Sequence, residues 1–262
     1  MKDERREWFD AEKKVAVTMV DVTTAAQELI RGHLAGPTSA HYLTKALAAV
    51  ALFGAETSQK NETVILQMKC TGLLGGFNVE CTAEGTLRGY TERKIIDEFD
   101  GLAAPRDETL IGEAQYQVTR SIPGRILSQG ISSSLECYLA GSLQRKATIQ
   151  IEAAISAECE VREARGVLVE EMPDGQGSGV LGVRFKSLAV SERNLLKQLA
   201  LDKAELRKCV PLKFACRCSP ERARTMLAAL SEAERAELPP KIDITCHMCG
   251  RLFSVSTGRG KE

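Results

Sequence analysis

Four cysteines near the end of the 262-residue chain have the spacing of a metal-binding site. They form a C-x-C pair and, after 27 intervening residues, a C-x-x-C pair, and they are Cys216, Cys218, Cys246 and Cys249. Two chelating pairs of thiolates at about 2.3 Å from the metal complete a closed tetrahedral zinc site. The sequence therefore predicts one zinc ion bound by these four cysteines. His247 lies inside the second pair, but four thiolates leave no vacancy for it.

A zinc–thiolate site is compatible with three kinds of function. As an inert structural site, which the spacing alone favours, it would stabilise a zinc-ribbon module that binds nucleic acid or protein. As a redox switch, it would lose zinc when the thiolates oxidise to disulfides, since each cysteine has a partner one or two residues away. As a thiol–disulfide oxidoreductase, the Cys246 and Cys249 pair would need a thioredoxin-like βαβ setting, which the surrounding pattern lacks.

Local signals indicate how the chain presents these two pairs. Alternation over residues 210–214 predicts a strand leading into the first pair, and Ser219 followed by Pro220 is typical of a helix start after it. A capping box at Ser231 predicts a second helical turn, and residues 241–245 predict the strand that enters the second pair. A module of about 45 residues has a small core, so zinc binding should supply much of its stability.

The residues upstream of this module predict an α+β fold. Leu43, Ala46, Leu47 and Val50 follow the i, i+3, i+4, i+7 spacing of a buried amphipathic helix over residues 40–56. Alternating and β-branched stretches predict strands at 63–69, 76–83, 86–92, 110–119, 148–155, 159–162 and 166–171. The first two of these strands are expected to form a hairpin.

A glycine-rich segment at 172–179 marks the end of this α+β region. We therefore predict a mixed α/β core domain (1–176), a helical linker (177–208), a small zinc-ribbon-like module (209–256) and a tail (257–262). In the linker, Ser191 can cap a helix that carries leucines on one side, namely Leu195, Leu196, Leu199 and Leu206. The core has a net charge of −7, the linker +4, and the module with the tail +3, so the basic parts are suited to dock on the acidic core.

The composition predicts a globular cytoplasmic protein. Hydrophobic residues make up 44% of the chain, yet no run approaches the roughly 20 apolar residues that a membrane span needs. Residues 1–14 alternate acids and bases, unlike a signal or transit peptide. In a reducing compartment, the nine cysteines are expected to serve as metal or redox sites and not as a disulfide framework. The small positive charge of the module makes nucleic acid a weak candidate partner.

The other cysteines and two of the histidines receive no functional role. Four cysteines occur singly within predicted elements and are expected to be small core residues: Cys70, Cys81, Cys137 and Cys159. Cys209 is an additional thiol that could enter disulfide exchange, although a small buried side chain is the favoured interpretation. His33 and His41 have no nucleophile nearby in the sequence, so acid–base catalysis is not expected and the protein is not predicted to be an enzyme.

Several segments together resemble one known family. They read Cys216-Arg-Cys218-Ser-Pro-Glu-Arg and Ile242-Asp-Ile-Thr-Cys246-His-Met-Cys249-Gly250, joined upstream by Gly76–Tyr90, with its final Arg-Gly-Tyr, and by Gly166–Pro173. In these segments the chain is similar to the redox-regulated 33-kilodalton heat-shock chaperones. It departs from the family pattern at residues 105–131 and 142–146.

The resemblance implies an ATP-independent holdase, a chaperone that binds unfolding proteins without catalysis. The reduced, zinc-bound form would be latent. Oxidation would join Cys216 to Cys218 and Cys246 to Cys249, release zinc and destabilise the linker. The oxidised form would then dimerise and bind unfolded client proteins under oxidative stress, with the linker acting as a latch on the core domain. In a switch of this kind, a local chemical change shifts the equilibrium between two conformations of a segment.

Overall fold

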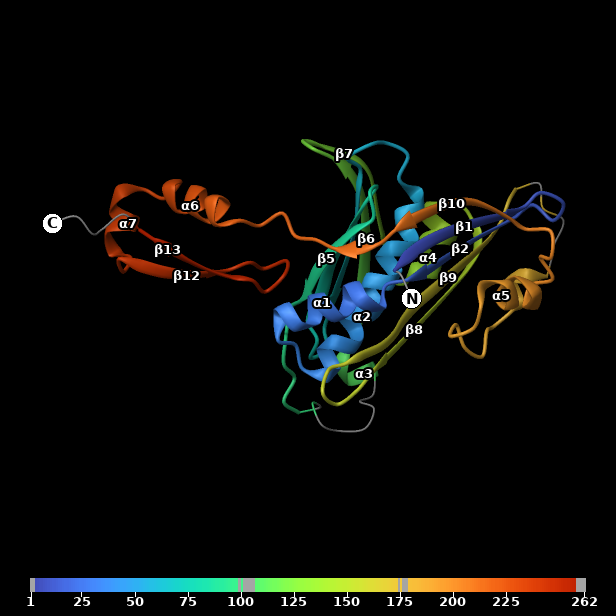
Figure 1. Ribbon diagram of the computed structural model, residues 1–262, viewed down its shortest axis with the longest axis horizontal. Coiled ribbons are helices and arrows are strands. Elements are labelled where there is room, and N and C mark those ends of the chain that lie inside the picture. The colour runs from blue at the N-terminus through green and yellow to red at the C-terminus, as the bar shows by residue number, and fades with distance from the viewer. Residues whose placement is uncertain (1–2, 99, 101–106, 174, 176–178, 258–262) are drawn as a thin grey trace.

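Two β-sheets enclose a buried helix, and a small C-terminal module projects from one side of this body (Figure 1). The computed structural model describes residues 3–98, 100, 107–173, 175 and 179–257. Within this part of the chain, no helix is long and apolar enough to cross a membrane. The predicted boundary at 176 and all but the first residue of the predicted tail lie outside the described residues, so the division into domains stays a prediction.

Sheet A consists of five antiparallel strands in the order β10-β1-β2-β9-β8. Their bounds are Glu205–Pro211 (β10), Glu4–Asp10 (β1), Val15–Asp21 (β2), Val161–Glu171 (β9) and Lys146–Ile155 (β8). No strand was predicted before residue 63, and the two strands predicted at 159–162 and 166–171 form the single strand β9. Both faces of β2 and β9 are buried, because one face contacts the interior of the body and the other contacts the linker.

Sheet B consists of six strands in the order β11-β5-β4-β3-β6-β7, antiparallel except for the β11–β5 pair. Their bounds are Lys213–Phe214 (β11), Thr86–Thr91 (β5), Gly76–Thr82 (β4), Thr63–Cys70 (β3), Ala114–Ile122 (β6) and Arg125–Ser132 (β7). The hairpin predicted between β3 and β4 is confirmed. The strand predicted from residue 110 begins later, at Ala114, because the short helix α3 (Asp107–Leu110) precedes it.

Helix α2 (Pro37–Phe53) forms the centre of the body. It contacts strands of both sheets and is buried on almost every side, which confirms the core helix predicted for residues 40–56. Five alanines in this helix keep it thin enough to fit between two sheets. Helix α1 (Thr23–His33) contacts the same core and ends where Leu34 adopts a left-handed conformation. A short helix, α4 (Leu135–Cys137), continues into a helical turn at Tyr138–Ser142.

The linker crosses the outer face of sheet A. It contains a short helical turn at Val180–Gly182 and one helix, α5 (Glu192–Gln198), which Ser191 caps as predicted by accepting a hydrogen bond from the N–H of Asn194. The expectation that Leu206 extends this helix is wrong. Residues 205–211 form β10 instead, because the free edge of β1 offers main-chain partners to them.

The C-terminal module follows β11. It contains α6 (Pro220–Ala228), α7 (Glu232–Glu237) and an antiparallel hairpin of β12 (Lys241–Thr245) and β13 (Leu252–Ser256). The predicted order of elements is confirmed. Ser219 caps α6 with Pro220 at its first turn, and Ser231 forms the predicted capping box with Glu234. These local signals succeed because caps depend on neighbouring residues alone.

Candidate metal centre

The four cysteines of the two predicted pairs come together in the structure. All four Sγ atoms lie within 4.8 Å of one another. Two of these distances join the two pairs: 3.7 Å between the Sγ atoms of Cys216 and Cys246, and 3.4 Å between those of Cys218 and Cys249. All nine cysteines of the chain lie among the described residues and carry free thiols. The cluster is therefore a reduced four-thiol site.

This arrangement fits a tetrahedral metal ion. Thiolates at about 2.3 Å from zinc place neighbouring sulfurs roughly 3.8 Å apart, close to the observed separations. Sulfur ligands in a tetrahedral set favour soft or borderline ions, of which zinc is the commonest in proteins. Cys249 is buried and the other three thiols are half-buried, so the site is shielded but accessible to small molecules.

The second pair lies on a tight turn between β12 and β13. The N–H of Cys246 donates to the carbonyl of Arg251, and the N–H of Gly250 donates to the carbonyl of Cys246, both at 2.8 Å. Gly250 has a φ of +72°, which a glycine adopts without strain. The turn aims the thiols of Cys246 and Cys249 toward the first pair, which lies between β11 and the start of α6.

The environment makes the four thiols unequal. Burial raises the pKa of Cys216, but hydrogen bonds from the backbone N–H of Cys218, from neighbouring thiols and from Arg88 outweigh it and lower that pKa to about 7. Burial and contacts with the other thiols raise the pKa of Cys218, and burial raises that of Cys249 to about 11. Four thiolates this close repel one another, so a bound cation is needed to keep all of them deprotonated.

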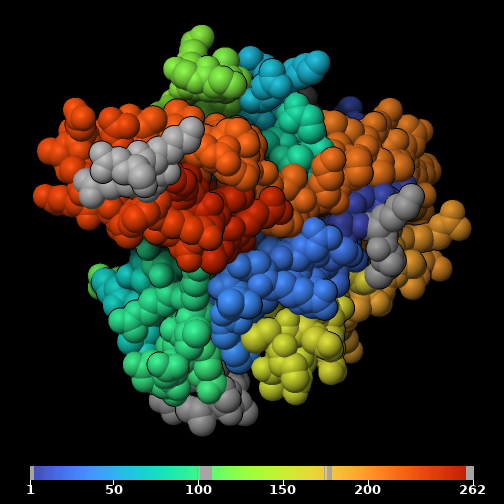
Figure 2. All heavy atoms as spheres, turned by 60° about the vertical axis from the view of Figure 1, so that its left-hand side comes forward, coloured from blue at the N-terminus to red at the C-terminus, as the bar shows by residue number. Residues whose placement is uncertain are grey.

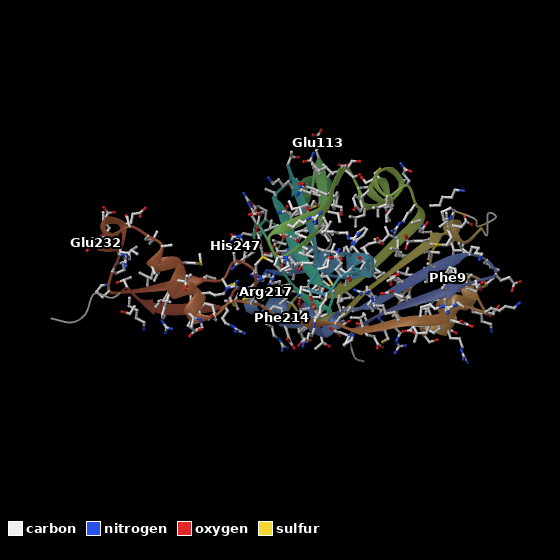
Figure 3. All side chains as sticks on the ribbon, turned by 90° about the horizontal axis from the view of Figure 1, so that it is seen from above. Phe9, Glu113, Phe214, Arg217, Glu232 and His247 are labelled. Atoms are coloured by element: carbon white, nitrogen blue, oxygen red, sulfur yellow. The ribbon has the colours of Figure 1, made fainter. Side chains whose placement is uncertain are left out.

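Strand β5 of the core contacts the metal centre directly. Arg88 directs its Nη1 at the Sγ of Cys216 at 3.9 Å, and it is held there by Glu80, which also pairs with Arg217. Next along the strand, the ring of Tyr90 meets the ring of His247 edge-on, with 4.0 Å between centroids. Figure 3 shows Arg217 and His247 at this junction, whereas Glu232 lies at the far end of the module. The thiols are therefore positioned by both the module and the core.

Helix α1 forms the other side of this contact. A side chain at Gly250 would lie 1.9 Å from the carbonyl oxygen of Gly32, and one at Gly32 would lie 2.5 Å from that of Cys249. Two glycines thus let two backbones touch. Beside them, the Nε2 of His33 contacts the carbonyl of Gly89 at 2.8 Å, and burial lowers the pKa of this histidine. Figure 2 shows the module, which comes forward in this view, above the blue surface of α1.

Two of the five cysteines outside the cluster are not buried as expected. Cys81 is buried as expected, and Cys70 and Cys159 are half-buried against the core. Cys137 and Cys209 are exposed, which contradicts the expectation that they are buried. Cys137 is the last residue of the short helix α4, and Cys209 lies on edge strand β10, where its Sγ is 3.3 Å from the carboxylate of Glu4.

The core contacts were missed because the sequence gives little sign of them. No role was assigned to His33, and its contact with Gly89 joins residues 56 positions apart. The one usable signal is the Arg-Gly-Tyr sequence at residues 88–90, which the family resemblance suggests is a turn and which the structure places within strand β5. Its three residues all contact the module or the residues that hold it.

The fold and the site define a class of protein: an α+β body with a covering linker and a small module that holds a cluster of four thiols suited to a metal ion. The model of the family described as Hsp33 protein matches residues 3–256, so the chain belongs to the Hsp33 family. The resemblance found in the sequence and the predicted α+β fold class are thereby confirmed.

Individual relatives agree with this assignment. The chain is 28% identical to a 33 kDa chaperonin of Thermus thermophilus, over 92% of this chain and 80% of that protein. It is 25% identical to the 33 kDa chaperonin of Lacticaseibacillus paracasei, over 89% of this chain and 88% of that protein. The crystal structure of the 33 kDa chaperonin from Thermotoga maritima matches with a TM-score of 0.84 at 17% identity, over 98% of this chain and 96% of that one, which supports the fold.

Proposed function

We propose that this protein is a redox-regulated, ATP-independent holdase and not an enzyme. The observation that carries the proposal is that four free thiols form one cluster on a module that contacts the core, while the linker before it covers an apolar face of sheet A. In the reduced state, zinc bound by Cys216, Cys218, Cys246 and Cys249 keeps the module folded and the protein latent. Chaperone names among the relatives support this interpretation.

Oxidation is the activating step of the proposal. Zinc, when bound, keeps the thiolates deprotonated and crosslinks the two pairs. Two molecules of hydrogen peroxide oxidise the four thiolates to two disulfides, take up four protons, become four waters and leave one zinc ion free. We assign the disulfides to Cys216 with Cys218 and Cys246 with Cys249, because the family resemblance implies this pairing. The module then loses its main source of stability.

The linker is the latch in this proposal. Its apolar side chains pack on the outer face of sheet A and form a second core, whose linker members are Val180, Phe185, Leu188, Leu195, Leu196, Leu199 and Leu201. Polar side chains of β8 hold the linker main chain: Gln150 bonds both the N–H and the carbonyl of Phe185, and Glu152 accepts from the N–H of Leu188. These contacts lie on the outer face of sheet A, apart from the core around α2, so the linker can detach without unfolding the body.

Detachment would uncover an apolar surface for clients. The sheet residues beneath the linker are Val15, Val17, Met19, Val167 and Val169. A contiguous patch of this kind binds other apolar surfaces, including those of unfolding proteins and of a second copy of the chain. We therefore include dimerisation of the oxidised form in the proposal, and a cytoplasmic location, because a thiol switch stays latent only where thiols are kept reduced.

The setting of the second pair argues against an oxidoreductase. Cys246 and Cys249 lie in a turn between two antiparallel strands, not at the start of a helix in a βαβ unit, where helix and loop dipoles activate a catalytic thiolate. No observation in the described residues favours nucleic acid as the partner.

The test compares the reduced and oxidised protein in three measurements. Zinc content, free thiols and suppression of the aggregation of a heat-unfolded client are measured before and after peroxide treatment at a mildly unfolding temperature. The proposal predicts one zinc ion per reduced chain, loss of four thiols with zinc release, and suppression by the oxidised form only. Equal suppression in both states, or zinc retained after oxidation, would refute it.

A further inference from the structure

Residues 212–215, here called the strap, cover the edge of strand β5. The strap contains β11, which pairs in parallel with Thr86 and Leu87. The N–H of Lys213 donates to the carbonyl of Gly85 at 3.0 Å, and the N–H of Ala215 donates to the carbonyl of Leu87 at 3.1 Å. Without the strap, these groups of β5 would form an open sheet edge.

The turn of the metal centre continues this coverage. The N–H of Gly89 donates to the carbonyl of Met248 at 3.2 Å, and Met248 lies between Cys246 and Cys249. The strap itself ends one residue before Cys216. Both segments that cover the edge of β5 are thus joined directly to ligands of the metal centre. Figure 3 shows Phe214 close to the junction that also contains Arg217 and His247.

The side chains of the strap alternate like those of a bound extended peptide. Leu212 is buried, and Phe214 packs against the same core, whereas Lys213 between them is exposed. Both apolar side chains line a pocket beside α1, together with Thr24 and Ala25 of that helix. The strap thus combines main-chain hydrogen bonds to β5 with apolar side chains at alternate residues. This is the pattern of strand addition, in which the peptide backbone provides affinity and pockets for alternate side chains provide selectivity.

We infer that the strap is an internal mimic of the client, and that the edge of β5 receives an extended segment of unfolded polypeptide once the metal centre is lost. The inference rests on the proposed function and names a client surface distinct from the face beneath the linker. Oxidation frees Cys216 and the turn at Met248, so the strap and the turn release β5. An incoming chain then pairs with Gly85, Leu87 and Gly89 through its backbone. Backbone pairing is independent of sequence, which suits a protein that must bind many clients.

Synthetic peptides test the hydrogen-bonding pattern on the full-length protein. A fluorescent peptide with the sequence of residues 210–215 is titrated with oxidised and with reduced, zinc-loaded protein, and its anisotropy is recorded. We expect binding to the oxidised form alone. N-methylation at the position of Ala215 removes one donor to β5 and should weaken binding about fivefold or more. N-methylation at the position of Phe214, whose amide is not one of the two donors, is the matched control and should change binding less than twofold.

The peptide results can overturn the inference in two ways. Equal effects of the two N-methylations would show that the peptide does not bind as an added strand. Failure of the unmodified peptide to bind the oxidised protein would show that the edge is not available.

A crosslinking experiment identifies the occupant. Tyr90→p-benzoylphenylalanine places a photoreactive ring on β5, and Lys60→p-benzoylphenylalanine, in an exposed turn outside the strands, is the control. Reduced and carboxymethylated α-lactalbumin serves as a permanently unfolded client. We expect an adduct with this client from the oxidised Tyr90 variant, and none from its reduced form or from the control.

The outcomes separate this inference from the proposed function. An adduct between two copies of the chain would make the edge a dimer contact and overturn the inference. Suppression of aggregation by the oxidised wild type without a client adduct at Tyr90 would also overturn it, while the holdase proposal would stand. Absence of suppression by the oxidised wild type would refute both.

Discussion

Substitution of Leu196 by alanine tests whether the linker is a latch. Leu196 lies on α5 with 6% of its surface exposed and belongs to the second core beneath the linker. Removing a buried leucine costs about 3 kcal/mol, and alanine keeps the helix intact. If this loss falls on the closed state of the linker alone, the population with an open linker rises on the order of 100-fold.

The assay measures linker opening in the reduced, zinc-loaded protein. Hydrogen exchange of the α5 amides should accelerate in Leu196→Ala, and the reduced variant should bind a hydrophobic dye and suppress client aggregation without oxidation. Lys197→Ala is the control, because the next side chain on the same helix is exposed and its loss changes stability by a few tenths of a kcal/mol. Unchanged exchange of α5 in Leu196→Ala, or faster exchange throughout the body, would refute the latch.

Three further changes probe other parts of the molecule. Gly250→Ala should speed zinc loss to a chelator, because a methyl group cannot fit against α1; Gly182→Ala, which has open space, should not. Hydrogen bonds from Arg120 and two backbone N–H groups outweigh burial and lower the pKa of Glu62, so its stabilising effect is present above the unfolded pKa and lost as the pH falls. Urea unfolding at pH 6 and pH 4 should therefore show a smaller acid loss in Glu62→Gln than in the wild type. Cys209→Ser should leave the disulfides found by peptide mapping after oxidation unchanged.

The metal centre could be predicted from sequence because its signals are local. The spacing of the cysteines, the glycine after Cys249 and the caps at Ser219 and Ser231 each act over a few residues, and the structure places all of them as expected. The proposed role of zinc as a switch, in contrast, follows from the family resemblance. Spacing alone favoured an inert structural site, because a closed four-thiol set looks the same in both cases.

The contacts between module and core could not be predicted, since they depend on distant residues. Gly32 and Gly250 carry no side chain that would signal a partner, and their contact exists only when both elements are folded. The first part of strand β10 is likewise predicted to be helical, whereas its last two residues belong to the strand predicted at 210–214. Polar and apolar residues alternate only weakly in this segment. It forms a strand because it pairs with the open edge of β1.

The position of β1 has a consequence for how the chain is made. Glu4 pairs with Pro211, 207 residues later, so β1 lacks its second neighbour until residue 211 has left the ribosome. The strap that follows β10 is made later still. A nascent chain therefore carries two sheet edges that the finished fold covers, at β1 and β5, and such open edges invite wrong pairing between chains. Translation that stops early would release a body with both edges uncovered and no latch to close them.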